Sequence, residues 1–133
     1  MRPKTFSALD FISSALAALF LLFLFIYPHI KLNAMRDDIV PLCDAVVEAV
    51  EAGDFEEALA RGEEIRARFL EDETMFRLIF DHEDVDSALD AIETLLLMIR
   101  QQDGPEAAIE TENVRSIVTF LAGIETLTFM NIF

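Results

Sequence analysis

An uncharged apolar run from Phe11 to Ile30 constrains this chain more than any other feature of its sequence. Its twenty residues, at a helical rise of about 1.5 Å each, cover roughly 30 Å, the thickness of a bilayer's hydrocarbon core. Asp10 precedes the run, and Tyr27 and Lys31 lie where an interfacial aromatic ring and a snorkelling cation are expected. The run therefore predicts one N-terminal transmembrane helix.

A cleaved signal peptide is the main alternative to a retained anchor. Its apolar region is usually about 7–15 residues long and ends at a small-x-small cleavage site. Here the run is longer, and the nearest candidate site, Leu32-Asn33-Ala34, fits poorly. We expect residues 1–36 to form a single-pass anchor in the cell membrane. The basic flanks are nearly balanced, so the short N-terminal tail favours a cytoplasmic N-terminus and an extracytoplasmic domain.

The remaining residues, 37–133, are strongly acidic. They contain six arginines, no lysine and 24 acidic residues, a formal charge of −18, whereas the whole chain carries −15. Phosphate backbones would repel such a domain, so we expect no nucleic-acid partner. The single cysteine, Cys43, cannot form an internal disulfide. We expect it to be a small core residue. The alternative is a disulfide between the Cys43 residues of two chains, which would give a homo-oligomer.

Apolar residues recur at three- and four-residue steps throughout residues 37–133, and no alternating strand pattern competes. The fold class predicted is therefore all-α, with one N-terminal transmembrane helix followed by an antiparallel four-helix bundle. Helix breakers between the periodic segments set the expected boundaries. The predicted helices cover residues 39–52, 54–70, 73–101 and 111–131.

The predicted turn between the first two bundle helices is similar to that of a tetratricopeptide repeat. Gly53 and Asp54 form the turn, and Phe55 and Ala58 begin the next helix. No second copy follows about 34 residues later, as a repeat array would require. A helical hairpin is therefore expected, with a peptide-binding adaptor as an alternative function.

His82 occupies a position on the apolar stripe of the predicted third helix, beside Glu83 and Asp86. The spacing fits neither an EF-hand loop nor the Glu-x-x-His pattern of di-iron bundles. We hypothesise that His82 pairs with Glu125 or Asn131 across the bundle. A pH- or cation-responsive sensor domain is the second alternative function.

The sequence contains no recognisable catalytic arrangement. Its serines lie in the anchor or have no histidine at a recognisable spacing, and its four glycines form no phosphate-binding loop. We therefore expect no enzymatic activity, no cofactor and no metal site.

Three short motifs resemble those of a family of small bacterial, single-anchor helical membrane proteins classed as a domain of unknown function. They are the hairpin Gly53-Asp54-Phe55-x-x-Ala58, the segment Asp81-His82-Glu83-x-Val85-Asp86, and Glu125 with the terminal Asn131-Ile132-Phe133. The resemblance implies architecture and topology but no reaction. The expected function is that of a membrane-anchored interaction or accessory protein of the bacterial envelope, with an unidentified protein partner.

Overall fold

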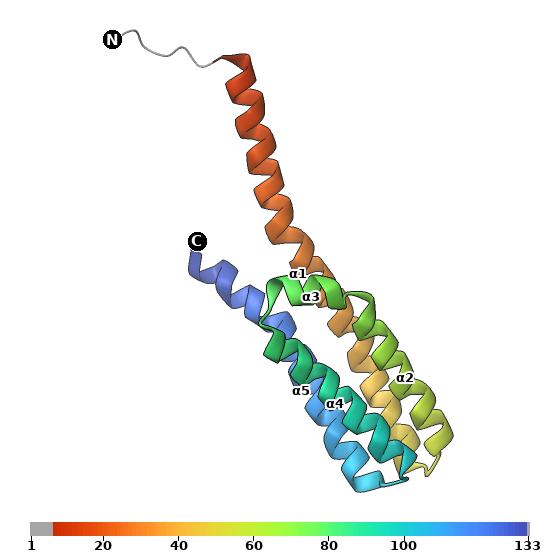
Figure 1. The fold of residues 1–133 in the computed structure, drawn as a ribbon. Coiled ribbons are helices and arrows are strands. Elements are labelled where there is room, and N and C mark those ends of the chain that lie inside the picture. Colours follow the sequence, from red (N-terminus) through yellow and green to blue (C-terminus); the bar gives the residue numbers. More distant parts are fainter. Residues whose placement is uncertain (1–6, 133) are drawn as a thin grey trace.

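The computed structural model describes residues 7–132, and it describes the side chains of residues 7–124. The described residues form helices and short connections, without a strand, which confirms the all-α class (Figure 1). The helices are α1 (Ala8–Glu51), α2 (Phe55–Glu71), α3 (Glu73–Ile79), α4 (His82–Arg100) and α5 (Gly104–Ile132).

Helix α1 is continuous over 44 residues, a length of about 66 Å. It starts at a capping box, in which Ser7 Oγ accepts from the Asp10 amide and Asp10 accepts from the Ser7 amide. The predicted anchor at residues 1–36 and the separate predicted helix at 39–52 imply a break at Asp37 and Asp38, two residues of a type that often caps helices. That expectation is wrong: these carboxylates pair with Arg36 and Arg68 instead of capping a helix.

Residues 31–124 form a packed region that we call the helical body. Within it, α1 packs against α2 and α5, and α4 packs against the same two helices. Figure 1 shows α1 and α4 running in one direction and α2 and α5 in the other. The stripe that α1 contributes to the core is fully or almost fully buried. It consists of Leu32, Met35, Ile39, Cys43, Val46, Ala49 and Val50.

Two similar turns lie at the end of the body that is distant from the apolar run. In the first, Gly53 has φ +73°, and the Asp54 amide donates to the Ala49 carbonyl at 2.8 Å. In the second, Gln102 has φ +58°, and the Asp103 amide donates to the Met98 carbonyl at 3.0 Å. Both have the geometry of a Schellman motif, which satisfies the last carbonyls of the preceding helix.

The predicted helix at 73–101 is wrong, because the chain breaks between α3 and α4. Phe80 is extended, with φ −104° and ψ 160°, and its ring lies 6.5 Å from that of Phe76. Glu83 and Asp84 then occupy the first turn of α4, where negative charge favours a helix N-terminus. The three- and four-residue spacing of apolar side chains therefore continues through a position where the helix itself is broken.

The last helix starts at Gly104, seven residues before the start predicted at Thr111. Asp103 accepts from the Glu106 amide at 3.2 Å and so caps the new helix. Pro105 is tolerated there, because the first turn needs no backbone donor. The Gly-Pro pair thus opens a helix and does not simply end one. Thr111 is buried, and its hydroxyl donates to the Ala107 carbonyl at 2.7 Å.

Candidate functional site

The junction where α1 enters the helical body carries a cluster of charged side chains. Lys31 follows the apolar run directly, and its Nζ lies 3.4 Å from Asp72 Oδ1 and 6.0 Å from the centre of the Tyr27 ring. Asp72 separates α2 from α3, and its side chain is only 11% exposed. The pair therefore ties the first residue beyond the apolar run to the α2–α3 connection.

Arg68 extends this cluster from α2. It contacts Asp72 at 2.9 Å and Asp38 of α1 at 2.6 Å, and its side chain is 15% exposed. Partly buried charges are held more firmly than exposed pairs, because water screens them less. The three contacts from Lys31 and Arg68 join α1, α2 and the start of α3 at one end of the body.

This cluster was missed in the sequence. The i,i+4 spacing of Arg68 and Asp72 is a recognisable helical pair and could have been found. The contacts from Lys31 to Asp72 and from Arg68 to Asp38 join distant segments, so no local spacing reveals them.

His82 does not lie on a buried stripe, and that expectation is wrong. It is exposed as the first residue of α4, at the end of the helix, whereas Val85, one turn later, is buried. Glu125 and Asn131, its expected partners, have side chains outside the described residues. The pairing therefore stays a prediction.

The other predicted site residues lie at separate places. Glu83 is exposed in the first turn of α4, and Asp86 contacts Arg77 of α3 at 2.8 Å. Gly53 and Asp54 lie in the turn between α1 and α2, where Asp54 accepts from the Glu57 amide at 3.0 Å. Ala58 follows in α2 and is fully buried.

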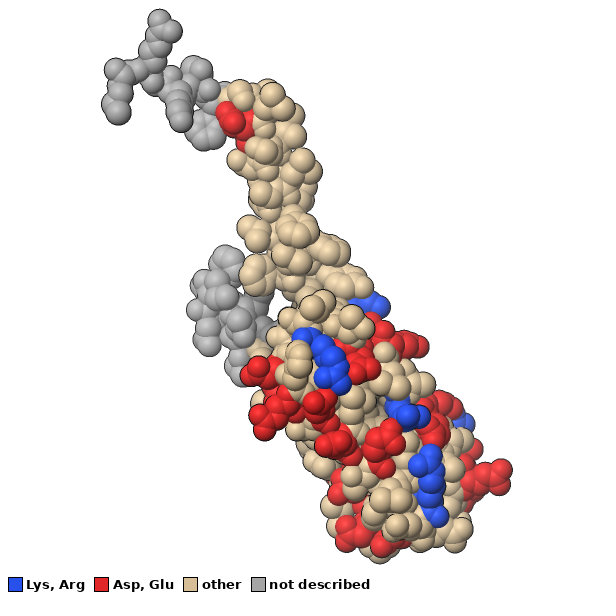
Figure 2. Space-filling model, viewed as in Figure 1, with Lys and Arg blue, Asp and Glu red and all other residues tan. Residues whose placement is uncertain are grey.

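The arginines of the body all contact carboxylates. Each of the six after residue 36 has its nearest carboxylate oxygen at 2.6–2.8 Å. Several pairs join helices, such as Arg66 with Glu93 and Arg115 with Asp44. Acids still outnumber these cations, and Figure 2 shows acidic side chains over the body and an almost uncharged apolar stem. Within residues 7–124, no group of three His, Cys, Asp or Glu side chains could hold a metal ion.

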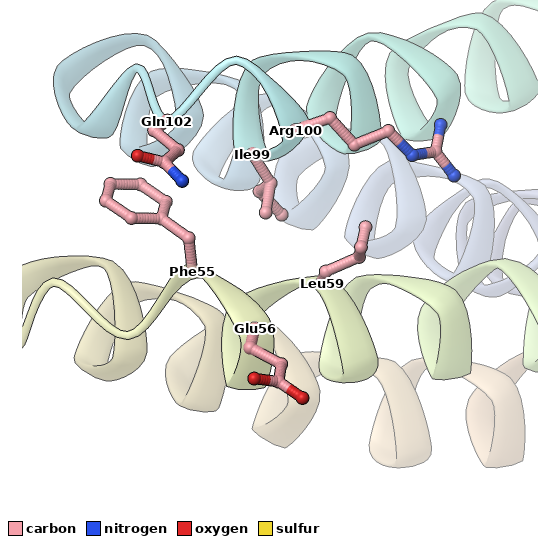
Figure 3. A pocket seen from close by; sticks show the side chains of 6 residues that line it. All are labelled: Phe55, Glu56, Leu59, Ile99, Arg100 and Gln102. Atoms are coloured by element: carbon pink, nitrogen blue, oxygen red, sulfur yellow. The ribbon is translucent and has the colours of Figure 1, made fainter.

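A pocket of about 310 Å³ lies between the start of α2 and the end of α4. Phe55, Leu59 and Ile99 face it, whereas Glu56 points away from it (Figure 3). Arg100 at its border contacts Glu63 at 2.7 Å. The lining is therefore mainly apolar, with the Gln102 amide as a polar group, and it presents no nucleophile or general base.

Cys43 is fully buried in the α1 stripe. Burial raises the pKa of its thiol to about 11, so the reactive thiolate is scarce at neutral pH. A surface cross-link through this residue would need the body to open. Cys43 is thus the core residue that was expected, and it offers no route to a covalent dimer in the folded state.

Comparison with curated proteins and with solved structures finds no match for the chain. A family model does match it, over residues 26–132, which include the end of the apolar run and the helical body. This agrees with the resemblance to a family of unknown function. The chain belongs to the family described as domain of unknown function DUF4363.

Proposed function

We propose that the protein is a non-enzymatic, single-pass membrane protein. The first half of α1 is its anchor, and the helical body is an antiparallel four-helix bundle held at the membrane surface. The body serves as an interaction or accessory module of the bacterial envelope, on the extracytoplasmic side.

The continuity of α1 is the observation that carries this proposal. Every large apolar side chain from Leu9 to Ile30 is 42–78% exposed, whereas the stripe from Leu32 to Val50 is at most 8% exposed. Within the described residues, α1 is the one helix long and apolar enough to cross a membrane. A helix that is apolar on every side and uncovered by protein matches a lipid environment.

The packing also argues against removal of the apolar run as a signal peptide. Cleavage after Ala34 would remove Leu32, which is fully buried in the core, and Lys31, which contacts Asp72. Burial of a leucine side chain is worth about 1.5–3 kcal/mol. A chain cut there would start inside its own core, so retention of α1 is favoured.

Several features support an interaction role over catalysis. The arginines are engaged with carboxylates, and the α2–α4 pocket is shallow and mainly apolar. The tetratricopeptide-like adaptor would need an open apolar groove between α1 and α2. Their stripes are buried instead, so we do not propose that function.

Alkaline carbonate extraction of membranes tests the anchor. The wild-type protein should stay in the pellet, and Leu16→Arg/Leu19→Arg should be released, because each arginine at the centre of a membrane helix costs about 2.5–3.5 kcal/mol. Both side chains are exposed in α1, so the body of the variant should unfold at the wild-type denaturant concentration. Release of the wild-type protein would contradict the proposal. Protease access in spheroplasts then tests on which side the body lies.

A further inference from the structure

Helix α3 lies at the level where α1 leaves the apolar run. Asp72, the residue directly before α3, has its Oδ1 3.4 Å from Lys31 Nζ, and Lys31 follows Ile30 directly. Figure 1 shows α3 lying across the end of the body from which the stem of α1 emerges. If residues 11–30 fill the hydrocarbon core, α3 is at the depth of the lipid headgroups.

Leu78 in α3 is the most exposed large apolar side chain described in the body. It is 83% exposed, whereas its neighbour Phe76 is fully buried and packs 5.2 Å from the ring of Phe69. This aromatic packing sets which face of α3 meets the core, and Leu78 lies on the exposed face. Removal of such a side chain from water is favourable, and the body alone leaves Leu78 in water.

The charges on α3 are already paired within the protein. Arg77 contacts Glu73 and Asp86, both at 2.8 Å. The edge that carries Leu78 can therefore approach lipid without desolvating an isolated charge of α3. Asp81 and Glu83 are exposed just beyond this helix, so the surrounding charge disfavours anionic lipid.

We propose that α3 is a second, non-spanning membrane contact, in which Leu78 enters the interface of a zwitterionic bilayer. This contact makes the apolar surface of α1 continuous with the end of the body and fixes how the body lies on the membrane. The proposal rests on the function proposed above, because a released protein would have no bilayer beside α3.

Tryptophan fluorescence tests this contact, because the chain contains no tryptophan. Full-length single-tryptophan variants are reconstituted in phosphatidylcholine vesicles with and without brominated acyl chains. The variants are Leu78→Trp in α3, Phe20→Trp in the apolar run, and Ile109→Trp near the distant turns, all at exposed positions. Thr74→Trp is a second probe, because it lies one turn before Leu78 on the same face.

The expected quenching is strongest for Phe20→Trp, intermediate for Leu78→Trp and absent for Ile109→Trp. Thr74→Trp should follow Leu78→Trp, and the emission of both should shift to the blue in vesicles. If Phe20→Trp is quenched and neither α3 probe is, the α3 contact is overturned and the anchor stands. A blue shift without quenching identifies protein, such as a second copy, as the cover of Leu78, and also overturns the contact. If Phe20→Trp itself is not quenched, the anchor fails and this proposal fails with it.

Discussion

The two halves of α1 share one helix but have different surroundings. In residues 8–30 the large apolar side chains are exposed on all sides, whereas in residues 31–51 one buried stripe alternates with charged residues. Both halves are rich in apolar residues, so the proportion of apolar residues does not distinguish them. Their distribution around the helix does: an all-round apolar surface suits lipid, and a one-sided stripe suits a protein core.

The surroundings of α1 change at Lys31, where the backbone stays helical. No cap and no glycine interrupts the helix there, and Pro28 and Pro41 both lie inside it. The body is consequently joined to the stem by continuous helix, and the contacts of Lys31 and Arg68 hold α2 beside it.

The largest expected effect is a difference in unfolding free energy between alanine variants of two leucines in α1. Leu32→Ala should lower the free energy of unfolding of the body by about 2–5 kcal/mol, because Leu32 is fully buried and its removal leaves a cavity. The matched control, Leu24→Ala, lies two turns earlier at 49% exposure and should leave that free energy unchanged. Denaturant titration in mild detergent measures both, and equal losses would contradict the division of α1.

Cys43 reports the packing of the second half directly. At pH 8, the rise of its pKa from 9.0 to about 11 lowers the thiolate fraction, and with it the labelling rate, by about 100-fold. Labelling with a thiol reagent before and after denaturation measures the ratio. Comparable rates in the two states would mean that this part of α1 is not held in the core.

Asp72→Asn tests the junction between the halves. The variant weakens the contacts with Lys31 and Arg68, and we expect a loss of about 1–2 kcal/mol in unfolding free energy. The neighbouring Glu71→Gln is the control, because its carboxylate is 68% exposed and its contact with Arg68 is longer, at 3.4 Å. A loss of unfolding free energy no greater than that of the control would mean that Asp72 does not stabilise the junction.

The smallest effect is expected at the turns farthest from the apolar run. Gln102→Gly should stabilise the body by about 0.5–1 kcal/mol, because φ +58° is unfavourable for a residue with a Cβ atom. Gly53→Ala should destabilise it by a similar amount at the equivalent position. Thermal unfolding measures both changes, and membrane retention should be the same for both variants. Shifts of equal sign would contradict the equivalence of the turns.

The helical class and the division at the apolar run follow from periodicity and charge, which are local properties. Helix ends were harder to predict, because the same residue type can mark the end of a helix or lie inside one. Asp37 and Asp38 resemble caps but pair with arginines, and Pro105 follows a stop but belongs to a new helix. The local pattern does not show which of these residues has a partner elsewhere in the fold.

The candidate site was less predictable than the fold. The apolar period runs through the break at Phe80, so it predicted a buried His82, whereas His82 is the exposed first residue of α4. The contacts of Lys31 and the exposure of Leu78 depend on where α3 lies, which is decided by the packing of Phe69, Phe76 and Phe80. Such positions follow from three-dimensional packing and have no signal in the spacing of residues.

Retention of α1 is tested most directly by the intact mass of the protein in the membrane and soluble fractions of expressing cells. We expect a membrane-bound chain that keeps the whole of α1, because the proposed anchor and the buried stripe from Leu32 to Val50 belong to one helix. A chain that begins near Met35, recovered in the soluble fraction with its body folded, would contradict it.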